Sequence, residues 1–146
     1  MFVIGIDPGT KTGIACFKEG KLIRLLSKTP LETITFLLNN ASKIKVAVIE
    51  DSKGQSHLFS AKKTQNKRVV AKIGRNVGEI DALCKLYLDC FRDFNIELIK
   101  VTPLKKGDKW KQEDFIGYFP DWKKRTNEHE RDAVKIVYKY NYHLIH

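Results

Sequence analysis

Cysteine is scarce in this chain of 146 residues, and its spacing gives no sign of a disulfide or a metal cluster. Cys16, Cys84 and Cys90 are an odd number without CxxC spacing, and each lies in an apolar run. We therefore expect reduced core thiols in an intracellular protein, and no zinc site. A single domain over residues 1–146 can bury roughly two-thirds of its unfolded surface, so its core requires no disulfide or structural metal.

Long apolar segments are also missing. No window approaches about 18 uncharged apolar residues, the length that suggests a membrane span. The N-terminus, Met-Phe-Val-Ile-Gly-Ile-Asp, has no basic n-region and carries an acid at Asp7. We expect neither secretion nor a membrane partner, and we predict a cytoplasmic protein.

Acidic residues are the minority charge. There are 17 Asp and Glu against 27 Lys and Arg, which gives a formal net charge of +10 and favours a polyanionic partner. No acid occurs between Ser52 and Gly78, a stretch that holds Lys53, Lys62, Lys63, Lys67, Arg68, Lys72 and Arg75. A second basic stretch, diluted by four acids, holds Lys105, Lys106, Lys109, Lys111, Lys123, Lys124 and Arg125. Each stretch is either a phosphate-binding surface or simply a solvated face.

Apolar patterning and turn residues predict an α/β domain. A continuous apolar run at 2–6 predicts a strand in the middle of a sheet, and strands at 13–17 and 21–26 complete an antiparallel meander. Two further strands are predicted at 44–50 and 96–101. Helices are predicted at 30–39, about 77–95, 109–119, and after Asn127, the last with an apolar face of Ala133, Ile136, Val137 and Tyr140. The polar stretch from 51 to about 72 is predicted to be a loop or a helix entry. The result is a mixed five-stranded sheet with flanking helices.

Polar side chains occur where two of these strands end. Asp7 ends the first strand and Glu50 ends the strand at 44–50, so the two carboxylates lie side by side if the strands are neighbours. Asp51 follows Glu50, but alternation lets only one of them face Asp7, and we expect Glu50. His129 and Asp132 share one face of the last helix at i, i+3 spacing. These side chains could bring a third and a fourth ligand to the same point.

Clustered carboxylates repel one another unless a pKa rises or cations bind between them. Two Mg²⁺ or Mn²⁺ ions about 4 Å apart, bridged by Asp7, could activate a water and stabilise the leaving oxygen in phosphodiester cleavage. His129 would then ligate Mn²⁺ or orient the water. Each residue alone also has a structural interpretation: Asp7 as a turn former, Glu50 as a surface acid, and His129 and Asp132 as polar groups of a helix start. Their joint placement favours the metal site.

Several segments resemble, in order and over most of the chain, the RuvC-type Holliday junction resolvases of the RNase H-like superfamily. Residues 4–15, Ile-Gly-Ile-Asp-Pro-Gly-Thr-Lys-Thr-Gly-Ile-Ala, look like the family's opening strand. Val-Ile-Glu at 48–50 is similar to its second-acid strand, and 72–78 to the glycine-punctuated start of its long helix. Val-Thr-Pro at 101–103 resembles its pre-catalytic loop, and His-Glu-Arg-Asp-Ala at 129–133 its closing acidic helix.

The resemblance implies an RNase H-like fold and a homodimeric, Mg²⁺- or Mn²⁺-dependent endonuclease that nicks four-way DNA junctions symmetrically. Asp7, Glu50, His129 and Asp132 would form its catalytic metal site. The expected DNA contacts are Lys53, Phe59, Lys62, Lys63, Lys67, Arg68, Lys72, Arg75, Lys105, Lys106, Lys109 and Lys111. The lysines and arginines would neutralise phosphates, and Phe59 and Trp110 would either stack on exposed bases or pack in the protein.

Two departures from the family pattern bear on the substrate. Lys53 stands where the family often has an aromatic residue, three positions after the second acid. The chain is also short and more basic than is typical of the family, which fits a bacterial, phage or mobile-element origin, with a phage-like or mobile-element branch favoured. Junction specificity is therefore less firmly implied than nuclease activity.

Three other functions remain open from the sequence. An RNase H-like nuclease could act on other branched DNA or on an RNA–DNA hybrid. A basic DNA-binding or repair module could keep the fold without catalysis. The Asp-Pro-Gly-Thr turn at 7–10 also resembles the phosphate loop of actin-like ATPases and sugar kinases, although those enzymes need two lobes and this length supplies one.

Overall fold

The computed structural model describes residues 1–50, 67–101, 109–139 and 141–146, with 67–77 described by their backbone. One sheet is formed by β1 (Phe2–Asp7), β2 (Thr12–Lys18), β3 (Lys21–Lys28), β4 (Ile44–Glu50) and β5 (Leu98–Val101), in the order β3-β2-β1-β4-β5. The first three strands pair antiparallel, and β4 and β5 are added parallel to β1. This confirms the predicted mixed sheet and the central position of the first strand.

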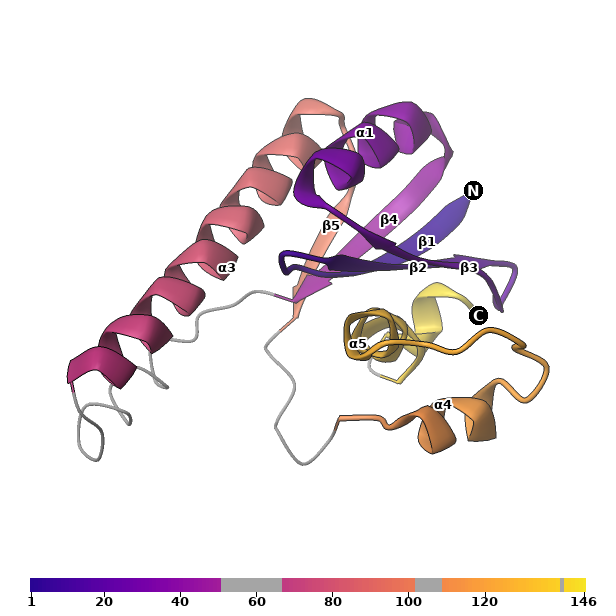
Figure 1. The fold of residues 1–146 in the computed structure, drawn as a ribbon. Coiled ribbons are helices and arrows are strands. Elements are labelled where there is room, and N and C mark those ends of the chain that lie inside the picture. Colours follow the sequence, from indigo (N-terminus) through magenta and orange to yellow (C-terminus); the bar gives the residue numbers. More distant parts are fainter. Residues whose placement is uncertain (51–66, 102–108, 140) are drawn as a thin grey trace.

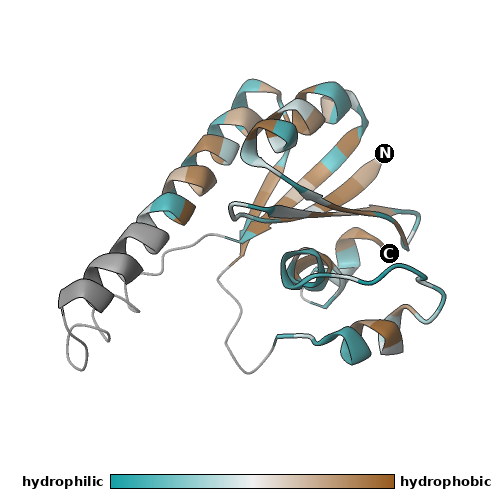
Figure 2. Ribbon diagram, viewed as in Figure 1, coloured by the Kyte–Doolittle hydropathy of each residue, from teal (hydrophilic) through white to brown (hydrophobic). Residues whose placement is uncertain are grey.

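The helices lie in two layers, one on each face of the sheet (Figure 1). They are α1 (Pro30–Asn40), α3 (Lys67–Asp93), α4 (Gln112–Tyr118) and α5 (Glu128–Tyr138), with short 3-10 turns η1 (Ala41–Lys43) and η3 (Tyr142–Leu144). The α1 and α3 helices cover one face, while α5 covers the other, with α4 beyond it. Figure 2 shows apolar residues concentrated in the strands between these layers. None of the helices in the described ranges is both long enough and apolar enough to span a membrane.

Several element boundaries differ from the predictions. The α3 helix begins at Lys67 rather than near residue 77, because residues such as Lys, Arg and Ala are good helix formers even without apolar periodicity. The α4 helix begins at Gln112 rather than at 109, and β5 begins at Leu98 rather than at 96. The last helix ends at Tyr138, and Tyr140 lies outside the described residues.

Strand alternation separates two cores. Ile4 and Ile6 of β1 pack in the core under α1 and α3, whereas Val3 packs in the core under α5. Asp7 therefore ends β1 on the α5 side of the sheet. On the opposite side, Tyr87 of α3 is fully buried, and its hydroxyl lies 2.7 Å from Thr12 Oγ1. Because the Thr12 hydroxyl donates to the Gly9 carbonyl at 3.0 Å, this pair ties the turn after Asp7 to α3.

The α5 helix lies directly on the backbone of β1 and β2. A Cβ placed on Gly5 would overlap the carbonyl oxygen of Ala133, and one placed on Gly13 would overlap the carbonyl oxygen of His129. In the β1–β2 ladder Gly5 pairs with Ala15, and Gly13 pairs with Asp7. Two strand glycines thus permit an approach that any other residue would prevent, since glycine alone has no side chain to place between sheet and helix.

We predict that Gly13→Ala lowers the free energy of unfolding by at least about 2 kcal/mol, because α5 must shift to accommodate the methyl group. The matched control is Gly78→Ala in α3, where a Cβ would meet no atom of the described residues within 4 Å. This control should raise stability by about 0.5–1 kcal/mol through helix propensity. Urea unfolding measures both variants, and equal stability of Gly13→Ala and the parent protein would contradict the role given to the close approach.

Candidate active site

The carboxyl end of β1 meets the first turns of α5. A capping box starts the helix: the Asn127 side chain accepts from the Glu130 amide at 2.8 Å, and the Glu130 carboxylate accepts from the Asn127 amide at 2.9 Å. The helix therefore begins at Glu128, and its first inward-facing residue is His129. His129 Nδ1 lies 2.7 Å from Asp7 Oδ2, which joins residues 122 positions apart in the sequence.

Asp132 lies one turn further along α5 and is almost completely buried, with a side chain only 3% exposed. Burial raises its pKa above the ordinary aspartate value, and the nearby charge of Asp7 raises it further. Its Oδ1 is buried and has no hydrogen-bond partner in the part of the chain that the structure describes. A buried carboxylate oxygen without a partner is costly, so it is expected where a ligand supplies the missing contact.

The other oxygen of Asp132 is held by a lysine. Lys109 Nζ lies 3.1 Å from Asp132 Oδ2 and 2.7 Å from Glu128 Oε1. Burial lowers the pKa of Lys109, but the hydrogen bond to Glu128 and the charge of Asp132 outweigh burial and raise it above its usual value. The hydrogen bond from Lys109 lowers the pKa of Glu128. The lysine is therefore a fixed positive charge at the edge of the acidic cluster.

Glu50 reaches the same edge of the sheet from β4. Parallel pairing of β1 and β4 sets Ile6 opposite Ile49, so Asp7 and Glu50 occupy the next position in register. Ile49 packs in the core under α1 and α3, and alternation therefore puts Glu50 on the α5 side, with Val48. Asp51 lies outside the described residues.

The donor types at this edge suit a hard divalent cation. Carboxylate oxygens and one imidazole are ligands that Mg²⁺ and Mn²⁺ accept, and the buried Oδ1 of Asp132 is a donor with no other partner among the described residues. The same side chains do not form a ready coordination shell: no group of three or more His, Cys, Asp or Glu in the described ranges is arranged to hold an ion. Asp7 is instead paired with His129, and Asp132 with Lys109.

Of the predicted DNA contacts, Lys109 and Lys111 are described with their side chains. Lys67, Arg68, Lys72 and Arg75 fall on the first turns of α3, where the structure describes the backbone. The remaining predicted contacts, Lys53, Phe59, Lys62, Lys63, Lys105 and Lys106, lie outside the described residues. Trp110 is 7% exposed and stacks on Tyr118 with ring centroids 4.7 Å apart, so it packs in the protein and does not offer its face to a base.

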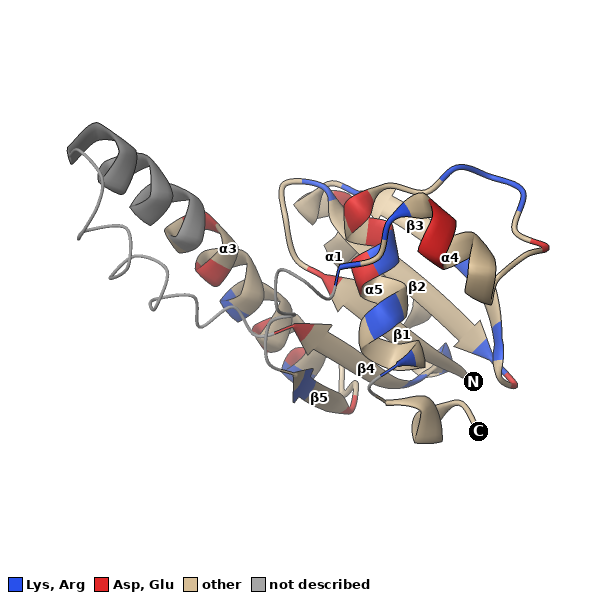
Figure 3. Ribbon diagram, turned by 90° about the horizontal axis from the view of Figure 1, so that it is seen from below, with Lys and Arg blue, Asp and Glu red and all other residues tan. Residues whose placement is uncertain are grey.

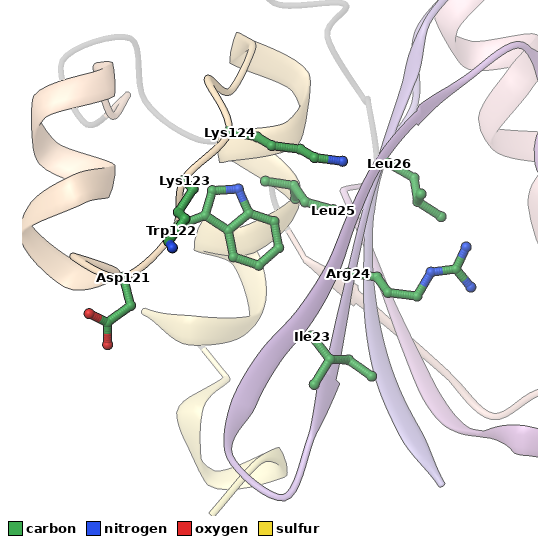
Figure 4. A pocket seen from close by; sticks show the side chains of 8 residues that line it. All are labelled: Ile23, Arg24, Leu25, Leu26, Asp121, Trp122, Lys123 and Lys124. Carbon is green, nitrogen blue, oxygen red and sulfur yellow. The ribbon is translucent and has the colours of Figure 1, made fainter.

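The basic residues between α4 and α5 form a separate surface. Figure 3 shows lysines and arginines along this connection and acidic residues at the first turns of both helices. Lys123 and Lys124 line a shallow pocket at the edge strand β3, which Trp122 and Leu25 also line, while Asp121 points away (Figure 4). This pocket is distinct from the cluster of Asp7, since its lining residues come from the middle of β3 and from 121–124.

Sequence reasoning missed two features of the site. It assigned Lys109 to DNA alone, although its ammonium group contacts two acids of α5. It also left Gly5 and Gly13 without a role, although glycine inside an apolar strand is a signal for close backbone approach.

Comparison with known proteins identifies the fold. No protein-family model matches the chain, and no curated protein sequence matches it. Among solved structures, T. thermophilus RuvC in complex with a Holliday junction substrate is similar over 99% of this chain and 94% of that chain, with a TM-score of 0.54 and 14% sequence identity. The chain has the RuvC fold. The predicted RNase H-like α/β fold, a mixed five-stranded sheet with flanking helices, is thereby confirmed, and at this identity the likeness extends to the fold alone.

The Asp7–His129 pair makes the titration of His129 a test of this geometry. The hydrogen bond to Asp7 raises the pKa of His129 above its ordinary value of 6.5, more than burial lowers it. The charged pair therefore stabilises the metal-free fold fully below about pH 6.5, and this contribution is lost as pH rises through the higher folded pKa. Because the His129 side chain is 45% exposed, we expect less than about 1 kcal/mol.

An NMR titration of the imidazole in chelator measures this pKa. We expect Asp7→Asn to lower the pKa of His129, because the variant replaces a charged acceptor by a neutral amide. An unchanged His129 titration in Asp7→Asn would show that the two side chains are not paired in solution.

Proposed function

We propose that the protein is a Mg²⁺- or Mn²⁺-dependent endonuclease that nicks four-way DNA junctions as a homodimer. The observation that carries the proposal is the meeting of Asp7, His129 and Asp132 at the carboxyl end of the central strand. The RuvC fold over nearly the whole chain supports it, because the similar T. thermophilus structure contains a Holliday junction substrate. A buried carboxylate oxygen without a partner among the described residues is difficult to explain in a purely structural module.

The residues divide into metal-holding and proton-handling groups. Asp7 and Asp132, with Glu50 beside them, would hold the divalent ion, which when bound supplies Lewis acidity and lowers the pKa of a coordinated water. His129 uses Nδ1 to contact Asp7, which leaves Nε2 as the ring nitrogen that can accept a proton. The Asp7 carboxylate holds the ring in that orientation, as a carboxylate commonly does for a catalytic histidine.

The positive charge of the chain supports a nucleic-acid substrate. Lysines and arginines bind phosphates without reading bases, so the net charge of +10 supplies affinity and not sequence preference. A four-way junction carries two equivalent strands to be cut, and a homodimer with twofold symmetry would place one active site on each. The other predicted DNA contacts lie at 53–63 and 105–106. The first turns of α3 and the segment at 109–111 are the described basic regions that are closest to them in sequence.

We predict that Asp7→Asn reduces cleavage of a synthetic four-way junction by at least about a thousandfold, because loss of a metal ligand removes several kcal/mol of transition-state stabilisation. Junction binding should be retained. Asp121→Asn is the matched control. Asp121 is exposed and points away from the other pocket residues in Figure 4, so this variant should cleave the junction at the rate of the parent protein. Undiminished cleavage by Asp7→Asn would overturn the assignment of the active site.

Matched substrates separate the proposal from its alternative. The four-way junction is compared with duplex DNA, a flap and an RNA–DNA hybrid, each with Mg²⁺, Mn²⁺ or chelator. Paired symmetric nicks confined to the junction support a dimeric resolvase. Metal-dependent cutting of the flap or the hybrid instead would support the assigned active site but contradict the four-way junction as substrate. No cutting of any substrate would contradict the proposed nuclease activity.

A further inference from the structure

Lys109 occupies an unusual place for a surface lysine. Its ammonium group contacts Glu128 at 2.7 Å and Asp132 at 3.1 Å, while the Asp132 side chain is 3% exposed. Exposed ion pairs contribute little to stability, but an ion pair to a buried carboxylate is different, because breaking it leaves an uncompensated charge in a poorly solvated position. The contact therefore has to be replaced by another cation whenever Lys109 leaves.

The backbone beside Lys109 is fixed independently of this ion pair. Arg131 of α5 donates from Nε to the Trp110 carbonyl at 2.9 Å and from Nη1 to the Thr126 carbonyl at 2.8 Å. The Thr126 amide donates in turn to Gln112 Oε1 at 3.0 Å. These contacts hold the extended segment before α4 against the start of α5. The backbone therefore positions Lys109 near Glu128 and Asp132, in addition to the attraction between their charges.

The contacts on Asp132 are asymmetric. One carboxylate oxygen accepts from the ammonium group, and the other is buried with no partner among the described residues. A lysine supplies a single point charge, so it neutralises the carboxylate without satisfying both oxygens. A divalent cation supplies a greater charge to the same group and can complete the coordination that the ammonium leaves unfinished.

We propose that Lys109 is the resident counter-cation of the active site and competes with the divalent metal for Asp132, an inference that rests on the proposed metal-dependent function. With the ion absent, the ammonium group neutralises Asp132 and Glu128 and keeps the buried acid compatible with the fold. Binding of the ion requires Lys109 to withdraw. Its side chain, 40% exposed, has solvent to enter when it does.

The test measures Mn²⁺ affinity directly, by the electron paramagnetic resonance signal of free Mn²⁺ at constant pH, without DNA. We expect Lys109→Met to bind Mn²⁺ about tenfold more tightly than the parent, because the ion no longer displaces a charge-assisted hydrogen bond. Lys109→Arg keeps the charge and should retain the parent affinity to within a few-fold. Lys111→Met is the matched control: Lys111 is exposed and forms no ion pair in the described part of the chain, so its removal should leave the affinity nearly unchanged.

Circular dichroism in chelator establishes that each variant is folded. If Lys109→Met does not fold, Lys109→Gln takes its place, because it also removes the charge and should also bind Mn²⁺ more tightly than the parent. An affinity of Lys109→Met equal to or weaker than that of the parent would overturn the competition while leaving the metal site intact. An equal gain in Lys111→Met would also overturn it, because the effect would then be one of net charge. Absence of Mn²⁺ binding by the parent, or binding that survives Asp7→Asn, would instead overturn the proposed metal site itself.

Discussion

The site depends on the contact between α5 and the bare backbone of two strands. Gly5 and Gly13 let the helix lie against β1 and β2 so closely that a methyl group at either position would overlap a helix carbonyl oxygen. This distance sets where the first two turns of α5 stand relative to the end of β1. His129 and Asp132 reach Asp7 because of it, and a helix held away by ordinary side chains would leave the three apart.

The electrostatics of the site follow from that geometry. Bringing Asp132 close to Asp7 in a buried position raises the pKa of Asp132, which is the cost of gathering acids. Two contacts offset this cost: the hydrogen bond between His129 and Asp7, and the ion pair between Lys109 and Asp132. These contacts occupy Asp7 Oδ2 and Asp132 Oδ2, and the described side chains form no ready coordination shell.

The fold was largely predictable because its signals are local. The apolar run that ends at Glu50 gave the bounds of β4, and capping boxes at Thr29 and Asn127 located the starts of α1 and α5. The position of Asp7 at a strand end and the i, i+3 spacing of His129 and Asp132 were also sufficient to predict that these three side chains lie near one another. The predicted start of α3 was wrong because the basic segment from Lys67 lacks the apolar periodicity that indicates a helix. The engagement of Lys109 was not predictable, because it depends on how the segment before α4 docks on α5, and this is fixed by tertiary contacts of Arg131 and Thr126.

The most direct test of this account is a crystal structure of the protein with Mn²⁺, in which anomalous scattering locates the ion. The account predicts an ion bound directly by carboxylate oxygens of Asp7 and Asp132, with the Lys109 ammonium withdrawn from Asp132. An ion located elsewhere, or none, with Asp7 still paired to His129 and Asp132 still paired to Lys109, would contradict it.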